Sequence, residues 1–137
     1  MRLAKFAALL VSASASALAA APAPSHPIVG TWSFALPNTS CVETYQIRAD
    51  GTAHITSAEE VSESEFDVAP SPSAKGYYKL TMKVVKDNGK PDCSGETMHV
   101  GDEVTDYVQV PKSGDALMFC QDESTSACFG PLKREAR

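Results

Sequence analysis

The sequence predicts an all-β protein, an antiparallel up-and-down β-barrel of about eight strands. Short segments of alternating apolar and polar residues recur along the chain, and no long stretch has the roughly 3.6-residue apolar period of a helix. Turn sequences such as Asp50-Gly51 and Asn88-Gly89 separate several of these segments, as expected for hairpins. A meander of hairpins removes its unpaired edges by closing on itself, so we expect a closed barrel.

Four strands are expected in the first half of the domain, at residues 28–35, 41–49, 52–58 and 61–69. In the second of them, Tyr45 and Ile47 share one face, because successive side chains of a strand point to opposite sides. In the fourth, Phe66 and Val68 share a face. The acidic residues between positions 59 and 67 are expected to form a solvated face that resists edge-to-edge pairing.

Five strand-like segments follow in the second half, at residues 76–86, 96–100, 104–110, 116–121 and 127–132. The first shows the clearest alternation, with Tyr78, Leu80 and Met82 on one face and lysines on the opposite face. Only Gly101-Asp102 interrupts the chain between the second and third of these segments. The last two are expected to pair as a hairpin.

The inward faces define a set of candidate cavity residues. They are the large apolar and aromatic residues Phe34, Tyr45, Ile47, Phe66, Tyr78, Leu80 and Met82. A barrel of about eight strands either fills its interior with side chains or holds one small ligand, and both outcomes have the same apolar–polar pattern. If a ligand is bound, we expect the hydroxyls of Tyr45 and Tyr78 to orient it in an otherwise apolar pocket.

The N-terminal residues 1–19 have the three parts of a cleavable signal peptide. Arg2 and Lys5 form the positive region, an apolar core follows, and Ala17-Leu18-Ala19 supplies the small residues before the expected cut. The apolar core is shorter than the ~20 residues of a spanning helix. We therefore expect an exported bacterial protein, periplasmic or secreted, without a membrane span.

After the signal we expect an extended, proline-rich lead-in at residues 20–27 and a single barrel domain at residues 28–137. Losing Arg2 and Lys5 with the signal takes the formal net charge from −5 to −7. An acidic balance argues against nucleic acid and anionic membrane surfaces as partners. The partner is expected to be a small apolar ligand or another exported protein, and the domain to be a monomer.

All four cysteines lie in the exported part of the chain, and an even number in a small exported domain favours two disulfides. Cys120 and Cys128 flank a polar turn between two apolar runs, so they can face each other across a hairpin. This leaves Cys41 to pair with Cys93. The cysteines are too far apart in sequence, and lack histidines at suitable spacing, for a zinc site.

Gly30-Thr31-Trp32 opens the first strand, and Arg134 lies near the end of the chain, with Arg137 as a second choice. Through this Gly-x-Trp and the C-terminal arginine the chain resembles the lipocalin-like, or calycin, barrels. The resemblance implies that the Trp32 indole covers the closed end of the barrel and that the arginine stacks on it. The short chain is also similar to avidin-like barrels and to small periplasmic barrel inhibitors of secreted metalloproteases, which are thought to insert an N-terminal segment into an active site.

The sequence contains no nucleophile motif, and the serine in Cys93-Ser94-Gly95 lacks the flanking glycine pattern of a hydrolase. We therefore expect no enzymatic activity, no cofactor and no metal. The favoured function is binding of a small hydrophobic or amphipathic molecule inside the barrel. The alternatives are a protein–protein module, such as a periplasmic inhibitor of an exported hydrolase, and an envelope factor with a filled core.

Overall fold

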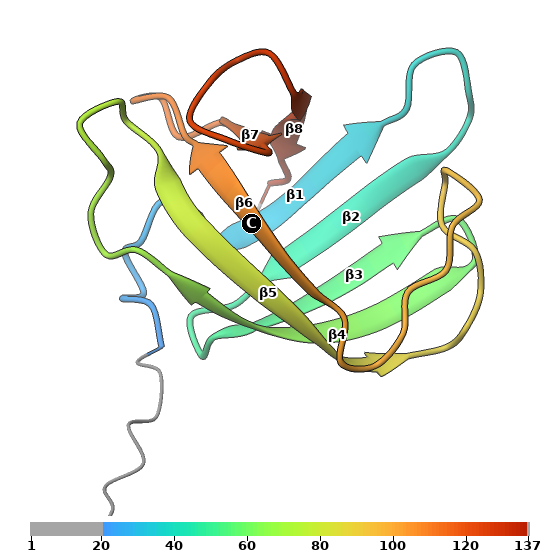
Figure 1. The fold of residues 1–137 in the computed structure, drawn as a ribbon. Coiled ribbons are helices and arrows are strands. Elements are labelled where there is room, and N and C mark those ends of the chain that lie inside the picture. Colours follow the sequence, from blue (N-terminus) through green and yellow to red (C-terminus); the bar gives the residue numbers. More distant parts are fainter. Residues whose placement is uncertain (1–20, 137) are drawn as a thin grey trace, which may run out of the picture.

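The chain forms a closed antiparallel barrel of eight strands, which confirms the predicted fold class (Figure 1). The structure is a computed structural model that describes residues 21–136. The strands are β1 (Gly30–Ala35), β2 (Val42–Ile47), β3 (Thr52–Ser57), β4 (Glu60–Val68), β5 (Tyr78–Asp87), β6 (Glu103–Gln109), β7 (Ala116–Cys120) and β8 (Cys128–Arg134). The predicted signal peptide at residues 1–19 and the second-choice Arg137 lie outside the described residues. Within the described part of the chain, no segment forms an apolar helix of the length that crossing a bilayer requires.

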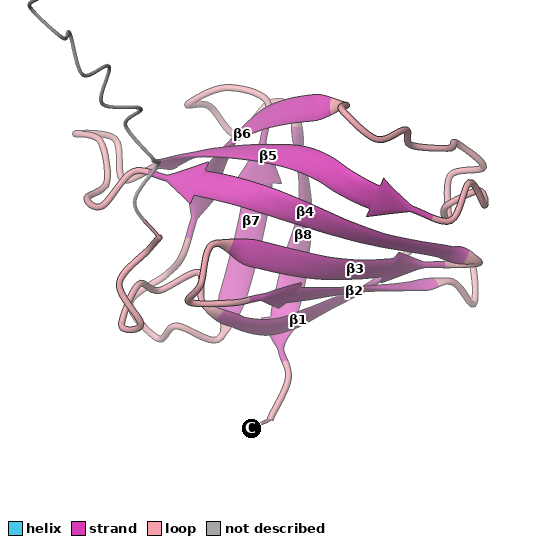
Figure 2. Cartoon of the chain, turned by 90° about the horizontal axis from the view of Figure 1, so that it is seen from below, coloured by secondary structure: helices cyan, strands magenta, loops and turns pink. Residues whose placement is uncertain are grey.

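Each strand pairs with the next in sequence, and the barrel closes where β8 pairs with β1 (Figure 2). Trp32 is opposite Tyr45 on β2 and opposite Arg134 on β8, so the first strand is held from both sides. Because side chains alternate along each strand, this register directs the apolar face of every strand to one common interior.

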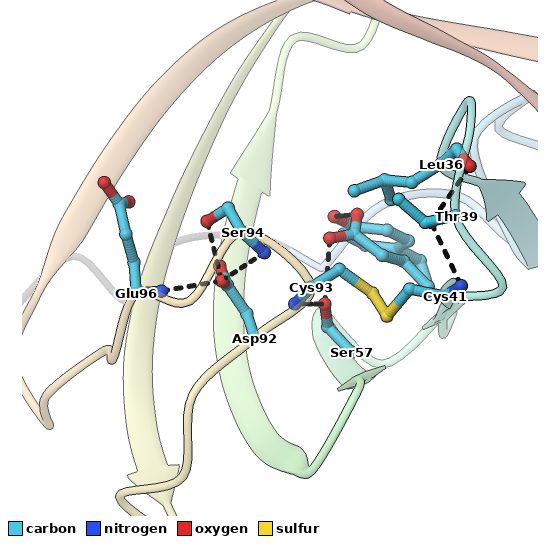
Figure 3. Close-up of a disulfide and its surroundings, with 10 residues drawn as sticks. Leu36, Thr39, Cys41, Ser57, Asp92, Cys93, Ser94 and Glu96 are labelled. Carbon is cyan, nitrogen blue, oxygen red and sulfur yellow. Dashed lines mark hydrogen bonds between the residues drawn. A yellow bond between two sulfur atoms is a disulfide. The ribbon is translucent and has the colours of Figure 1, made fainter.

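The strand predicted at residues 96–100 is wrong. These residues belong to a long loop, residues 88–102, that joins β5 to β6. The Asp92 carboxylate accepts hydrogen bonds from the backbone N–H groups of Ser94 (2.8 Å) and Glu96 (3.0 Å), which winds the loop into a turn (Figure 3). Gly95 and Gly101 both have positive φ, at 85° and 97°, which breaks the extended conformation on either side of the segment.

At the end of the barrel where β1 begins, here called the closed end, Arg134 and Trp32 form the contact that the resemblance implies. The Arg134 guanidinium carbon lies 4.0 Å from the indole centroid, and the indole N–H donates to the Ile28 carbonyl at 2.8 Å. A Cβ on Gly30 would lie 2.2 Å from the guanidinium, and Gly30 has a φ of 150°. A glycine is therefore required where the arginine passes over β1.

The core lies toward this closed end. It consists of buried apolar residues from β1 to β8 and from the segment before β1: Ile28, Trp32, Ile47, Ala53, Phe66, Val68, Leu80, Val108, Leu117, Phe119 and Leu132. The chain before β1 also packs here, since His26 is buried, its Nε2 is 3.0 Å from the Ala69 carbonyl and its ring meets Tyr78 edge-on. Residues 24–28 accordingly include two turns.

Both predicted disulfides are present, Cys41–Cys93 and Cys120–Cys128. Two disulfides in a chain of this size indicate an oxidising, extracytoplasmic compartment. The first links the loop between β1 and β2 to the long loop between β5 and β6 (Figure 3). The second lies next to the turn of the β7–β8 hairpin, where the last residue of β7 pairs with the first residue of β8. Both bridges therefore belong to the end opposite the closed end, here called the mouth.

Candidate functional site

The mouth contains a cavity of about 170 Å³, here called the mouth cavity. It extends into the barrel from the loops that carry the Cys41–Cys93 disulfide. Residues from the seven strands β2 to β8 and from the long loop line it: Glu43, Tyr45, Ile55, Ser57, Glu60, Ser62, Ser64, Met82, Val84, Asp92, Met98, Val104, Asp106, Phe119 and Phe129. The barrel is thus filled at its closed end and hollow at its mouth.

Small side chains on two neighbouring strands leave this space empty. On β4, Ser62 and Ser64 point inward at positions where the same face nearer the closed end carries Phe66 and Val68. Ser57 adds a third small inward side chain from β3. A hydroxymethyl group occupies far less volume than a phenyl ring, so the packed core ends where the serines begin.

One wall of the mouth cavity is aromatic. The rings of Phe119 and Phe129 stack with centroids 5.0 Å apart, and Tyr45 lies 5.7 Å from Phe119. Phe34 makes an edge-to-face contact with Phe129, and the two ring centroids are 5.9 Å apart. Phe129 is 37% exposed, so this wall reaches the solvent at the mouth.

The polar wall adjoins the aromatic wall at Tyr45 and begins with a hydrogen-bonded chain that connects the cavity to the disulfide loop. The hydroxyls of Tyr45 and Ser57 donate to the two oxygens of Glu43, at 2.9 and 2.8 Å. The backbone N–H of Cys93 donates to the Ser57 hydroxyl at 2.9 Å (Figure 3). Burial, and next the nearby charge of Glu43, raises the pKa of Tyr45, so its hydroxyl stays protonated and remains a donor.

Glu60 is the least exposed carboxyl that lines the mouth cavity, with an exposed fraction of 4%. Burial raises its pKa to about 7, and the neighbouring charges of Asp87, Asp92 and Glu43 add to the effect. One oxygen of Asp87 is itself buried without a hydrogen-bond partner. On the other side of the cavity, burial also raises the pKa of Asp106.

The position of Glu60 corrects the prediction of a solvated acidic strand. Glu63, Glu65 and Asp67 do lie on the outward side of β4, but Glu60 shares the inward side with Phe66. The inward position of Glu60 was predictable from the alternation of side chains along a strand, because residues 60 and 66 are an even number of positions apart and share a face. The many acidic residues around position 60 led instead to the prediction that all of them are solvated.

The structure separates the candidate cavity residues into three groups. Tyr45 and Met82 line the mouth cavity, and Phe34 does not line it but packs against Phe129 of its aromatic wall. Ile47, Phe66 and Leu80 are buried in the core. Tyr78 lies at the closed end against His26, so the hydroxyls of Tyr45 and Tyr78 belong to different ends of the barrel.

The sequence did not lead us to predict the acidic residues of the lining, or the two phenylalanines of the aromatic wall, as candidate cavity residues. The missed residues are Glu43, Glu60, Asp106, Phe119 and Phe129. Alternation places Asp106 on the same face as Val108, so parity could have found it as well. Within residues 21–136, no three acidic, histidine or cysteine side chains converge closely enough to hold a metal ion.

No protein-family model, curated protein or solved structure matches this chain. The fold and the cavity nevertheless define a class: a small, disulfide-bonded, closed β-barrel with a filled end and a hollow, acid-lined mouth.

Proposed function

We propose that the protein is an exported, lipocalin-like binding protein, periplasmic or secreted, that holds a small amphipathic molecule in its mouth cavity. The observation that carries this proposal is the pairing of an aromatic wall, Phe119 and Phe129, with a polar wall that contains Glu43 and Glu60 around one space. Concave sites with a largely apolar lining and a few placed polar groups are typical of small-molecule sites. The proposed protein is a monomer without enzymatic activity.

The size of the cavity limits the ligand. A volume of 170 Å³ compares with the ~150 Å³ of an engineered cavity that binds benzene, and is below the roughly 300 Å³ at which drug-sized pockets begin. A single ring or a short chain fits inside. A larger ligand would leave its remainder in the opening beside Phe129, which is partly exposed.

The polar groups that line the cavity are carboxyls and hydroxyls, which can bind the polar part of a ligand. The residues that line it include no histidine and no cysteine, and its ionisable side chains are the carboxyls of Glu43, Glu60, Asp92 and Asp106 and the Tyr45 phenol. His54, on the outer face of β3, is instead engaged by Glu63, with 2.6 Å between Nδ1 and Oε1. Within the lining, the Ser57 hydroxyl donates to Glu43 and also accepts from the backbone N–H of Cys93, which supports a structural role for this pair in holding the disulfide loop.

A protein–protein module is the second candidate, and one observation favours it. Several apolar residues on strands or loops at the mouth are exposed: Val42, Val100, Val104 and Phe129. They would let mouth loops contact an exported protein such as a hydrolase. An inhibitor that inserts its lead-in is a poorer fit, because His26 and Ile28 are buried against the barrel and hold that segment in place.

Filling the mouth cavity tests the favoured function. Ser64 is buried and lines the cavity, so Ser64→Val places two methyl groups in the space, whereas Ser64→Ala adds no volume. A library of one-ring and short-chain fragments would be screened by ligand-observed NMR. We expect fragments to bind the wild type and Ser64→Ala, and to bind Ser64→Val at least about tenfold more weakly.

Two outcomes would count against the proposal. If no fragment binds the wild type, the protein–protein module becomes the favoured function. If Ser64→Val binds as tightly as Ser64→Ala, the fragments occupy a different place.

A further inference from the structure

We propose that the natural ligand of the mouth cavity is a small organic cation: an amine carried by an aromatic ring or a short apolar chain. This inference rests on the proposed function and names the chemical class of its ligand. The ammonium group would lie at Glu60, between Glu43 and Asp106, and the apolar part would lie on the stacked rings of Phe119 and Phe129.

The charges that line the cavity are all of one sign. The described residues around it include Glu43, Glu60, Asp92 and Asp106, and no lysine, arginine or histidine. Such a cavity repels carboxylates and phosphates and concentrates cations, because the surrounding protein screens charge less than water does. Fatty acids and other anionic amphiphiles are therefore poor candidates.

Glu60 lacks the donors that a buried carboxylate needs. Among residues 21–136 no N–H or hydroxyl group donates to its side chain; the charge nearest to it in effect is that of Asp87, another acid, one oxygen of which is buried without a partner. By contrast, Glu43 receives two hydroxyl donors. A buried charge is costly unless it is paired, and an ammonium group brings both the opposite charge and several N–H donors.

The aromatic wall suits the same ligand. A cation within about 6 Å of an aromatic ring face is attracted by the ring, and recognition of organic ammonium ions by aromatic residues uses this contact. Phe119 and Phe129 present ring surface to the cavity, and Tyr45 stands where the aromatic and acidic walls meet, because it contacts Phe119 and donates to Glu43. A neutral ligand would use the rings and leave Glu60 unpaired.

When no cation is bound, a proton on the Glu60 carboxyl neutralises its charge. The groups that face Glu60 are Glu43 on β2, Asp87 at the end of β5 and Asp92 in the long loop, all acids, and together with burial they keep part of the Glu60 population protonated near pH 7. A bound ammonium favours the ionised form, so binding must release protons. Affinity for the cation should accordingly fall as the pH is lowered below about 7.

The test compares two probes of the same size and shape, benzylamine and benzyl alcohol, by titration calorimetry at pH 7. The amine is charged at this pH and the alcohol is neutral. We expect benzylamine to bind at least about tenfold more tightly, since hydrogen bonds to charged groups are stronger than neutral ones. Repeating the titration in buffers of different ionisation enthalpy measures the protons released, which we expect for the amine and not for the alcohol.

Variants of β4 locate the effect. Glu60→Gln should remove most of the preference for benzylamine and the proton release, and leave the affinity for benzyl alcohol unchanged. Glu65→Gln removes a charge from the outward face of the same strand and should change neither. Asp106→Asn, which changes a lining residue on β6, provides a second variant if Glu60→Gln does not fold.

The outcomes separate this inference from the proposed function. Equal binding of the two probes, or neutral fragments that bind while benzylamine does not, overturns the cationic ligand and leaves small-molecule binding intact. A benzylamine preference that survives in both Glu60→Gln and Asp106→Asn also overturns it. Failure of every fragment, charged or neutral, overturns both.

Discussion

At the closed end, the Arg134 guanidinium donates to the carbonyls of Pro27, Val29 and Gly114 at 2.6–2.9 Å and stacks on Trp32. At the mouth, the Glu60 carboxyl is buried next to the Asp87 carboxyl and other acids. Both ends place a charged side chain inside the barrel. Only the first supplies the partners that its charge requires, so the first is a structural contact and the second is the place where the proposed ligand would gain binding energy.

The two ends also differ in what holds them. Packed side chains and hydrogen bonds hold the closed end, whereas covalent bridges hold the loops of the mouth. A hollow end cannot gain stability from buried apolar contacts, because its walls face empty space. The disulfides keep the mouth in shape without filling it.

The largest effect is expected from breaking the mouth. The Cys41–Cys93 bridge closes a loop with a sequence separation of 52, and Cys120–Cys128 one with a separation of 8. In the chain-entropy view, replacing the first pair by alanine costs about 4 kcal/mol of unfolding free energy and replacing the second about 2.5 kcal/mol. Urea unfolding followed by Trp32 fluorescence measures both.

Hydrogen exchange of the same variants shows where the loss falls. Without Cys41–Cys93, amides of the long loop at residues 88–102 should exchange faster, while those around Trp32 keep their relative protection. Equal acceleration at both ends would mean that the two ends are one cooperative unit.

The next largest effect is expected from removing the Arg134 contacts at the closed end. Arg134→Ala removes the contact with the indole and three hydrogen bonds to backbone carbonyls, so we expect a loss of about 2–3 kcal/mol and a shift in Trp32 emission. Lys133→Ala changes an exposed neighbour on the same strand and should cost little. An unchanged emission spectrum in Arg134→Ala would contradict the stacking of the guanidinium on the indole.

The smallest expected effect is a pH dependence of the stability, which comes from Glu60 at the mouth and has no counterpart at the closed end. The folded protein holds the Glu60 proton more tightly than the unfolded chain does, because its pKa is raised from 4.5 to about 7. The stability that this proton contributes is therefore complete below about pH 4.5 and is lost as the pH rises through about 7. Glu60→Gln should raise the melting temperature at pH 8 by a few degrees and have little effect at pH 4.5.

The control for this prediction is Glu65→Gln, on the outward face of β4. If Glu60→Gln lowers the melting temperature at pH 8, the Glu60 carboxylate has a favourable partner in the empty protein. The mouth, like the closed end, would then supply a favourable partner for its buried charged side chain.

Periodicity and turn residues predicted the closed barrel because it depends on local sequence pattern. The positions of the cysteines around a polar turn predicted Cys120–Cys128 and left Cys41 to pair with Cys93. The Trp32–Arg134 contact was implied by the resemblance to calycin barrels. The hollow was not predictable from the apolar–polar pattern alone, since filled and empty interiors share it. It depends on side-chain volume along β4, where Ser62 and Ser64 stand on the face that carries Phe66. The segment at residues 96–100 was mispredicted as a strand because its turn forms around Asp92, outside the segment.

The contact between Arg134 and the Pro27 carbonyl joins residues that are 107 positions apart. During synthesis the N-terminal residues emerge first, so β1 can pair with β2 early while its other edge waits for β8. The arginine that seals the barrel belongs to that last strand. The final closure of the barrel is therefore a late, long-range step that requires nearly the whole chain, and a translation product that stops short of β8 keeps β1 as an open edge available to other chains.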